Sequence, residues 1–156
     1  MTKSTLKLKQ YAQESREIVN YLVVIDTNVI VSALLSRHSD ASTVQVIEAL
    51  LDDQFTPIYN DEILSEYDDV LHRKKFHFPE STIQALLQYF KKYGIYADRL
   101  ATDEMLPDPK DLAFYEVCMA KREEDSMLVT GNMKHFPSKP FIVTPNELLD
   151  IIRTNP

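Results

Sequence analysis

Residues 21–30, YLVVIDTNVI, place a continuous apolar run directly before Asp26. The run at 21–25 is short and rich in β-branched residues, which predicts a fully buried strand of a parallel sheet. The residues that follow it include neither glycine nor proline, so a tight hairpin is not expected and the chain is predicted to continue into a helix. The stretch therefore predicts a carboxylate at the end of a buried strand, where it needs polar partners.

Apolar runs alternate with helical patterns along the rest of the chain. Further strands are predicted at FTPIY (55–59), IYADR (95–99), SMLVT (126–130) and FIV (141–143). Helices are predicted at 28–36, 41–53, 60–73, 81–94, 108–121 and 144–152. Strands separated by helices imply right-handed crossovers and a parallel sheet covered on both faces. The predicted fold class is therefore α/β, a three-layer α/β/α sandwich.

Local signals mark the ends of several predicted helices. Side chains that accept from backbone N–H groups favour a helix start, proline favours the first helical position, and glycine favours the end. The predicted end signals are Asn60 or Asp61, Ser81, Gly94, Asp108 with Pro109, and a capping box of Thr144 with Glu147.

The chain has 156 residues, a length that fits one domain. Residues 1–20 are predicted to form a basic N-terminal arm, and residues 21–156 a single domain. The single cysteine, Cys118, excludes an internal disulfide and a thiolate zinc cluster, and its apolar surroundings favour a buried position. No secretory leader or membrane-spanning run is recognisable, so a cytoplasmic protein without membrane contact is expected.

The formal net charge of −7 argues against a nonspecific nucleic-acid coat protein. It does not exclude an enzyme that acts on nucleic acid, because catalytic carboxylates make a domain acidic. Short basic groups are present, and each is either a solvated helix end or a substrate contact. These groups are Arg73 with Lys74 and Lys75, Lys91 with Lys92, Lys121 with Arg122, and Lys134 with His135.

Several oxygen-bearing side chains are predicted to meet at one edge of the sheet. In open parallel sheets, sites form beyond the carboxyl ends of the strands. Asp26 ends the first strand at that edge, and Asn132 directly follows the strand at 126–130. Glu66 lies on the helix after the second strand and leans back toward the same edge. Glu62 shares its helix face but is interpreted as a surface acid.

Two further acids, Asp108 and Asp111, begin a helix whose start is expected to face this edge. Glu123, Glu124 and Asp125 instead precede the strand at 126–130. They are therefore expected at the opposite end of the sheet, as surface charge.

Converging carboxylates repel one another unless a cation separates them. Oxygen ligands without histidine or cysteine suit Mg²⁺ or Mn²⁺ rather than zinc. Such sites typically serve phosphoryl chemistry. Structural interpretations stay open: Asp108 as a helix cap, Asp111 as a complement to the helix dipole, Glu66 as a solvated acid, and Asn28 as part of a helix start. Asp26 is the hardest to explain in this way.

The order and spacing of five motifs resemble the PIN-domain family. The resemblance is to the toxin components of bacterial toxin–antitoxin pairs, with VapC-type toxins among the wider relatives, and it covers about residues 21–150. The motifs are VVIDTNVIVSALLS (23–36), NDEILSEYDDVL (60–71), LPDPKDLAFYEVCMA (106–120), LVTGNMKHFP (128–137) and FIVTPNELL (141–149).

The resemblance implies a metal-dependent endoribonuclease with Mg²⁺ or Mn²⁺ as cofactor. Carried over position by position, the catalytic and metal-binding acids are Asp26, Glu66 and Asp111, with Asp108 close by. The fourth acidic position of the family is usually aspartate and here is Asn132, which keeps one oxygen but removes a charge. A second metal ion is therefore expected to bind more weakly than the first.

The resemblance and the alternation of elements together predict five strands in the order 3-2-1-4-5. Substrate contact is expected from Asn28, Thr130, Lys134 and His135. The expected partners are an RNA substrate, an antitoxin protein whose segment occupies the acidic groove, and a second copy of the chain in a homodimer.

Other functions remain open at this point. One is a nuclease for housekeeping RNA processing or for structured DNA. Another is a catalytically weak module that binds RNA or a partner, which Asn132 and the net acidity favour. A flavodoxin-like nucleotide-binding domain is disfavoured, because two glycines in the chain leave no phosphate-cradling loop.

Overall fold

The computed structural model describes residues 20–154. Its centre is a five-stranded sheet in the order β3-β2-β1-β4-β5, in which all neighbouring strands run parallel. The strands are β1 (Leu22–Ile25), β2 (Thr56–Tyr59), β3 (Ile95–Tyr96), β4 (Met127–Val129) and β5 (Ile142–Val143). The predicted strand order is confirmed. The predicted arm at 1–20 lies, apart from residue 20, outside the described residues.

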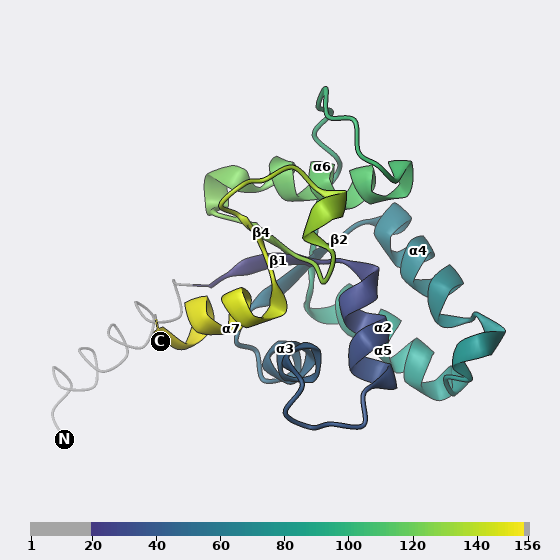
Figure 1. Ribbon diagram of the computed structural model, residues 1–156. Helices are drawn as coiled ribbons and strands as arrows, with labels where there is room; N and C mark the ends of the chain where they lie inside the picture. Colours follow the sequence, from purple (N-terminus) through teal and green to yellow (C-terminus); the bar gives the residue numbers. More distant parts are fainter. Residues whose placement is uncertain (1–19, 155–156) are drawn as a thin grey trace, which may run out of the picture.

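Six α-helices connect and cover the strands within the described part of the chain. They are α2 (Thr27–Leu35), α3 (Ser42–Leu51), α4 (Asp61–Leu71), α5 (Glu80–Tyr93), α6 (Leu112–Ala120) and α7 (Pro145–Thr154). Short 3₁₀ turns are η1 (Lys74–Phe76), η2 (Pro109–Asp111), η3 (Arg122–Glu124) and η4 (Met133–His135). Figure 1 shows α6 on one side of the sheet and α3 with α7 on the other. The predicted three-layer α/β/α sandwich is confirmed, and no helix within residues 20–154 has the length and apolarity to cross a bilayer.

The core lies between the sheet and its helices. All four residues of β1 are buried, as the continuous apolar run predicts. The rings of Tyr67 on α4, Phe90 on α5 and Phe114 on α6 pack together, with centroids 5.1 and 6.0 Å from Tyr67. Burial of these aromatic side chains joins the three helices within the core.

Cys118 is fully buried on α6, as its apolar surroundings predict. The Ser126 hydroxyl donates to the Cys118 carbonyl at 2.6 Å, linking the end of α6 to the start of β4. Burial raises the pKa of the Cys118 thiol to about 11. The thiol is therefore protonated at neutral pH and has the character of a packing group.

Most of the predicted helix ends are confirmed. Asn60 Oδ1 accepts from the Ile63 N–H at 2.9 Å at the start of α4. Thr144 and Glu147 form the predicted reciprocal capping box, with distances of 3.0 and 3.2 Å. Asp108 Oδ1 accepts from the Lys110 N–H at 3.0 Å, but it caps the 3₁₀ turn η2, and α6 itself begins only at Leu112.

The predicted start of α5 at Ser81 is wrong. The helix begins at Glu80, with Pro79 in the cap position and no side-chain cap. The Pro79 carbonyl accepts from the N–H groups of Thr82 and Ile83, so the helical bonds begin before Ser81 is reached. The rigid φ of proline, here −60°, already suits a residue that precedes a helix.

Gly94 ends α5, as predicted, but not through a left-handed conformation. Its φ is −83°, which any residue can adopt. Space explains the glycine instead: a Cβ atom there would lie 2.5 Å from the Phe90 carbonyl oxygen and 2.8 Å from Tyr59 Cδ1. Glycine thus permits the close approach of the end of α5 to β2.

Candidate active site at the carboxyl edge of the sheet

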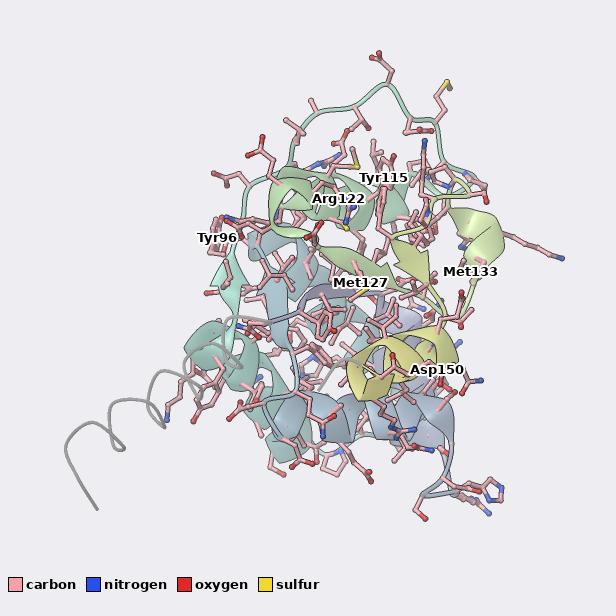
Figure 2. The ribbon with its side chains drawn as sticks, turned by 90° about the vertical axis from the view of Figure 1, so that its left-hand side faces the viewer. Tyr96, Tyr115, Arg122, Met127, Met133 and Asp150 are labelled. Atoms are coloured by element: carbon pink, nitrogen blue, oxygen red, sulfur yellow. The ribbon has the colours of Figure 1, made fainter. Side chains whose placement is uncertain are left out.

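A cavity of about 320 Å³ opens beyond the carboxyl ends of β1 and β4. Figure 2 labels Met127, the first residue of β4, and Met133, in the turn η4 beyond the end of that strand. Six residues singled out from the sequence line the cavity: Asp26, Asn28, Glu66, Asp108, Asp111 and His135. Elements far apart in the chain therefore bring these side chains to one place.

Asp26 occupies the position before α2 without capping that helix with its side chain. Its Oδ2 atom instead accepts from the Thr130 hydroxyl at 2.8 Å, across the neighbouring strand. Burial is the main reason that the pKa of Asp26 rises to about 6; the Thr130 hydrogen bond opposes this rise, and the charge of the nearby Asp111 adds to it. Thr130 is the polar partner that a carboxylate at this position requires, and it lies beneath the cavity and not on its wall.

Tyr67 positions the helix that carries Glu66. Its buried hydroxyl donates to the Ile25 carbonyl at 2.5 Å, at the residue just before Asp26. Burial raises the pKa of Tyr67 well above its usual value, so the phenol stays protonated and remains a donor. The bond links α4 to the end of β1 and holds Glu66 at a set place relative to Asp26.

Asp111 faces His135, whose Nδ1 atom lies 3.1 Å from Asp111 Oδ2. Burial raises the pKa of Asp111, and the charges of Asp108 and Glu66 raise it further, whereas His135 opposes the rise. Asp111 therefore senses the charges of both neighbouring acids, as a carboxylate in a shared site does.

Asn132 lies against His135 and does not line the cavity. Its Nδ2 atom is 2.9 Å from His135 Nε2. An amide N–H donates in that contact, which makes Nε2 the acceptor and Nδ1 the nitrogen that donates to Asp111. The backbone N–H of Asn132 also donates to the Thr130 hydroxyl at 2.9 Å. Asn132 thus supports the two acids through His135 and Thr130.

The start of α2 contributes Asn28 and Thr27 to the cavity wall. Asn28 Oδ1 accepts from the Gly131 N–H at 3.0 Å, which ties the start of α2 to the turn after β4. The Thr27 hydroxyl is the one buried side-chain oxygen or nitrogen among residues 20–154 without a hydrogen-bond partner. An unpaired hydroxyl of this kind, next to Asp26, is a polar group available to a ligand.

The donor chemistry fits a hard divalent cation, although the ligands are not assembled as a cluster. Within the described residues, no group of three or more His, Cys, Asp or Glu side chains is placed as a ready metal site. The oxygens of Asp26, Glu66 and Asp111 nevertheless share one cavity with the unpaired Thr27 hydroxyl. Burial, and to a smaller extent repulsion between the acids, raises the pKa values of the two aspartates, and a bound cation would offset both effects.

Sequence reasoning missed three residues of this site: Thr27, Tyr67 and Lys110. Arg73 belongs to a basic group that the sequence marks as a helix end or a substrate contact, but its place beside the acids was not predicted. Lys134, an expected substrate contact, is exposed on η4 and is not part of the cavity wall.

Comparison with known proteins gives a family match over most of the chain. The model of the PIN domain family matches residues 22–134. One solved structure with a similar chain is that of VapBC2 from Rickettsia felis bound to a DNA fragment from their promoter. The two chains share 22% sequence identity, with a TM-score of 0.48. The match covers 79% of this chain and 96% of that one. No curated protein gives a significant match.

Proposed function

The chain belongs to the PIN-domain family, and on that premise we propose that it is a metal-dependent endoribonuclease acting as the toxin of a toxin–antitoxin pair. PIN domains are generally nucleases that use divalent metals. The observation that carries the proposal is the pair Asp26 and Asp111, two buried acids with raised pKa values on one cavity wall with Glu66.

Asp26, Glu66 and Asp111 would hold Mg²⁺ or Mn²⁺, with Asp108 at the rim. When bound, such an ion supplies Lewis acidity toward a phosphodiester and compensates the charge of the carboxylates. Asn132 is proposed to support these ligands and not to bind the first ion, because its amide is engaged by His135.

The other residues of the site hold the acids in place and receive the substrate. Thr130 orients the Asp26 carboxylate, and His135 orients that of Asp111. Arg73 and Lys110 place positive charge on the same cavity wall, where an RNA phosphate would be attracted. The proposed metal ligands and two cations suited to the backbone of the substrate therefore share one cavity.

The test is cleavage of single-stranded RNA by the purified protein, with Mg²⁺ or Mn²⁺ titrated and then removed by EDTA. Cleavage is expected with either metal and not in EDTA. Glu66→Gln should lower the rate by about 100-fold or more, because a ligand and its charge are lost together.

Glu62→Gln is the matched control for this test. Glu62 lies on the same helix, is exposed, and pairs with Arg99 at 2.9 Å outside the cavity. Its replacement should leave the cleavage rate close to that of the wild type. Equal rates for wild type, Glu66→Gln and Asp26→Asn would refute the assignment of the site.

The toxin role is tested in cells. Induced expression of the wild type should arrest growth, and the product of a small neighbouring gene should relieve the arrest. Asp26→Asn should not arrest growth.

Light scattering of the purified protein tests the expected homodimer.

A second candidate is an RNA-binding module with little catalysis. The absence of a ready three-residue metal group within residues 20–154 favours it. The cleavage assay separates the two, because the module would bind RNA without metal-dependent products.

A further inference from the structure

A short basic and aromatic segment, RKKFHF at residues 73–78, follows α4. Arg73, Lys74, Lys75 and His77 are exposed, whereas Phe76 and Phe78 are half-buried. Figure 1 places the segment at the bend that joins α4 to α5. We call residues 73–78 the basic–aromatic segment.

The two phenylalanine rings of this segment stack on each other. Their centroids are 5.2 Å apart and their planes differ by 14°. His77, between them, has a left-handed backbone φ of 56°, which turns Phe78 back toward Phe76. The pair is thus a local aromatic surface held by the backbone.

The segment borders the acidic cavity. Arg73 and Phe76 line that cavity together with Asp26 and Asp111. On its other side, Arg73, Lys74, His77 and Phe78 line a second hollow of about 350 Å³. The segment therefore separates two hollows, of which one contains the proposed ligands.

Within residues 20–154, the three cations Arg73, Lys74 and Lys75 are not held by neighbouring acids in ion pairs. The acids on either side, Asp68 and Glu80, pair with His72 at 3.0 and 2.6 Å. No ion pair in the described part of the chain involves Arg73, Lys74 or Lys75. In a chain of net charge −7, three unpaired cations beside an acidic cavity indicate an anionic partner.

We propose that the basic–aromatic segment binds single-stranded RNA, stacking a base on the Phe76–Phe78 pair and contacting phosphates with Arg73, Lys74 and Lys75. This proposal rests on the proposed function for its choice of RNA. Stacking on an aromatic side chain requires an unpaired base, which a single strand offers and a duplex does not.

Lys75 is expected to change its contact when a base binds. Its Nζ atom lies 5.1 Å from the centroid of the Phe76 ring. A base that stacks on the ring displaces this ammonium group, and the long exposed side chain is then free to reach a phosphate. The strand would continue from the segment past Arg73 into the acidic cavity.

The experiment measures fluorescence anisotropy of a labelled single-stranded RNA in EDTA, so that the wild-type protein binds without cleaving. Phe76→Leu should weaken binding by about tenfold, since stacking is lost while apolar bulk is kept. Lys74→Gln combined with Lys75→Gln should reduce the slope of log affinity against log salt by about 1.4, for two lost phosphate contacts. A hairpin of the same composition should bind more weakly than the single strand.

The end of α5 offers matched controls. Lys92 lies 5.2 Å from the Tyr93 ring centroid, a similar cation–aromatic pair away from the cavity. Tyr93→Leu and the double change Lys91→Gln with Lys92→Gln should leave both affinity and salt slope unchanged. Thermal unfolding checks that each variant is folded.

Two outcomes would overturn the proposal. One is an affinity for the labelled RNA equal to that of the wild type in both Phe76→Leu and the Lys74–Lys75 variant. The other is an equal loss of affinity in the α5 controls, which would show that binding is not specific to the basic–aromatic segment. Failure of the proposed function is distinct from both: binding that depends on Phe76 without metal-dependent cleavage retains the segment and rejects the nuclease.

Discussion

The imidazole of His135 holds Asp111 through Nδ1 at 3.1 Å while Asn132 holds its Nε2 at 2.9 Å. A carboxylate at position 132 could not donate to a neutral Nε2 atom, whereas an amide can. The presence of asparagine and not aspartate at position 132 therefore has a local physical reason. The amide donates to Nε2, which leaves Nδ1 directed at Asp111.

Replacement of Asn132 by alanine should loosen His135 and, through it, Asp111. Partners that orient a metal ligand commonly contribute 10-fold or more to affinity, so Mn²⁺ binding should weaken by about tenfold. Calorimetry of the purified protein measures this. Met133→Ala, in the same turn, is the control and should bind Mn²⁺ as the wild type does. Unchanged affinity in Asn132→Ala would contradict a supporting role.

The metal-free protein should lose stability as the pH rises from about 4 to about 6. The folded pKa of Asp26 is about 6, above the unfolded value, so the folded state binds the proton more tightly and ionisation costs stability. A shift of about two pKa units corresponds to about 3 kcal/mol. Asp111, whose pKa is also raised, acts in the same direction.

Denaturant unfolding in EDTA across this pH range measures the effect. Asp26→Asn should flatten the pH profile and raise the free energy of unfolding at pH 8. The exposed acid Asp69 is the comparison, and Asp69→Asn should keep the wild-type profile. A steep profile that persists in Asp26→Asn would show that another group is responsible.

Tyr67→Phe should affect both stability and the site. The change removes the hydroxyl donor of the buried Ile25 carbonyl, at a cost of about 1–3 kcal/mol. Glu66 would then be held less firmly against Asp26, so Mn²⁺ affinity should fall as well. Thermal unfolding and calorimetry give the two readouts. The exposed Tyr93 supplies the control, since Tyr93→Phe should alter neither quantity.

Lys134→Ala tests the substrate contact expected from the sequence. The side chain is exposed beside His135 and outside the cavity wall, so a contact with RNA would be mainly electrostatic. Binding of single-stranded RNA should weaken modestly, and its salt slope should fall by about 0.7. An unchanged salt titration would remove Lys134 from the set of contacts.

Continuous apolar runs made the fold predictable. A strand such as Leu22–Ile25 is buried on both faces, so its composition alone indicates a central position. Caps at Asn60 and Thr144 were predictable because each bond spans three residues. The start of α5 was not predictable, because Pro79 and Ser81 both favour a helix start. Only the hydrogen bonds that the Pro79 carbonyl accepts decide between them.

The acids of the site were predictable because parallel strands share one carboxyl edge. The contacts that hold them were not. The Tyr67 hydroxyl reaches a carbonyl 42 residues away, and a tyrosine in an apolar helical stripe has the same pattern whether it packs or donates. Asn132 was expected to bind metal from its place after β4, yet its amide is directed at His135. Side-chain direction after a strand depends on tertiary neighbours that no local pattern encodes.

The buried thiol of Cys118 can report how often the molecule opens locally around α6. The chain has one cysteine, and its burial on α6 keeps thiol reagents out of the closed state. Labelling of the thiol therefore requires α6 to separate from β4. When closing is faster than labelling, the labelling rate follows the population of that open form. Because α6 begins directly after Asp111, a ligand held by that carboxylate would slow the modification of a sulfur atom that it never touches.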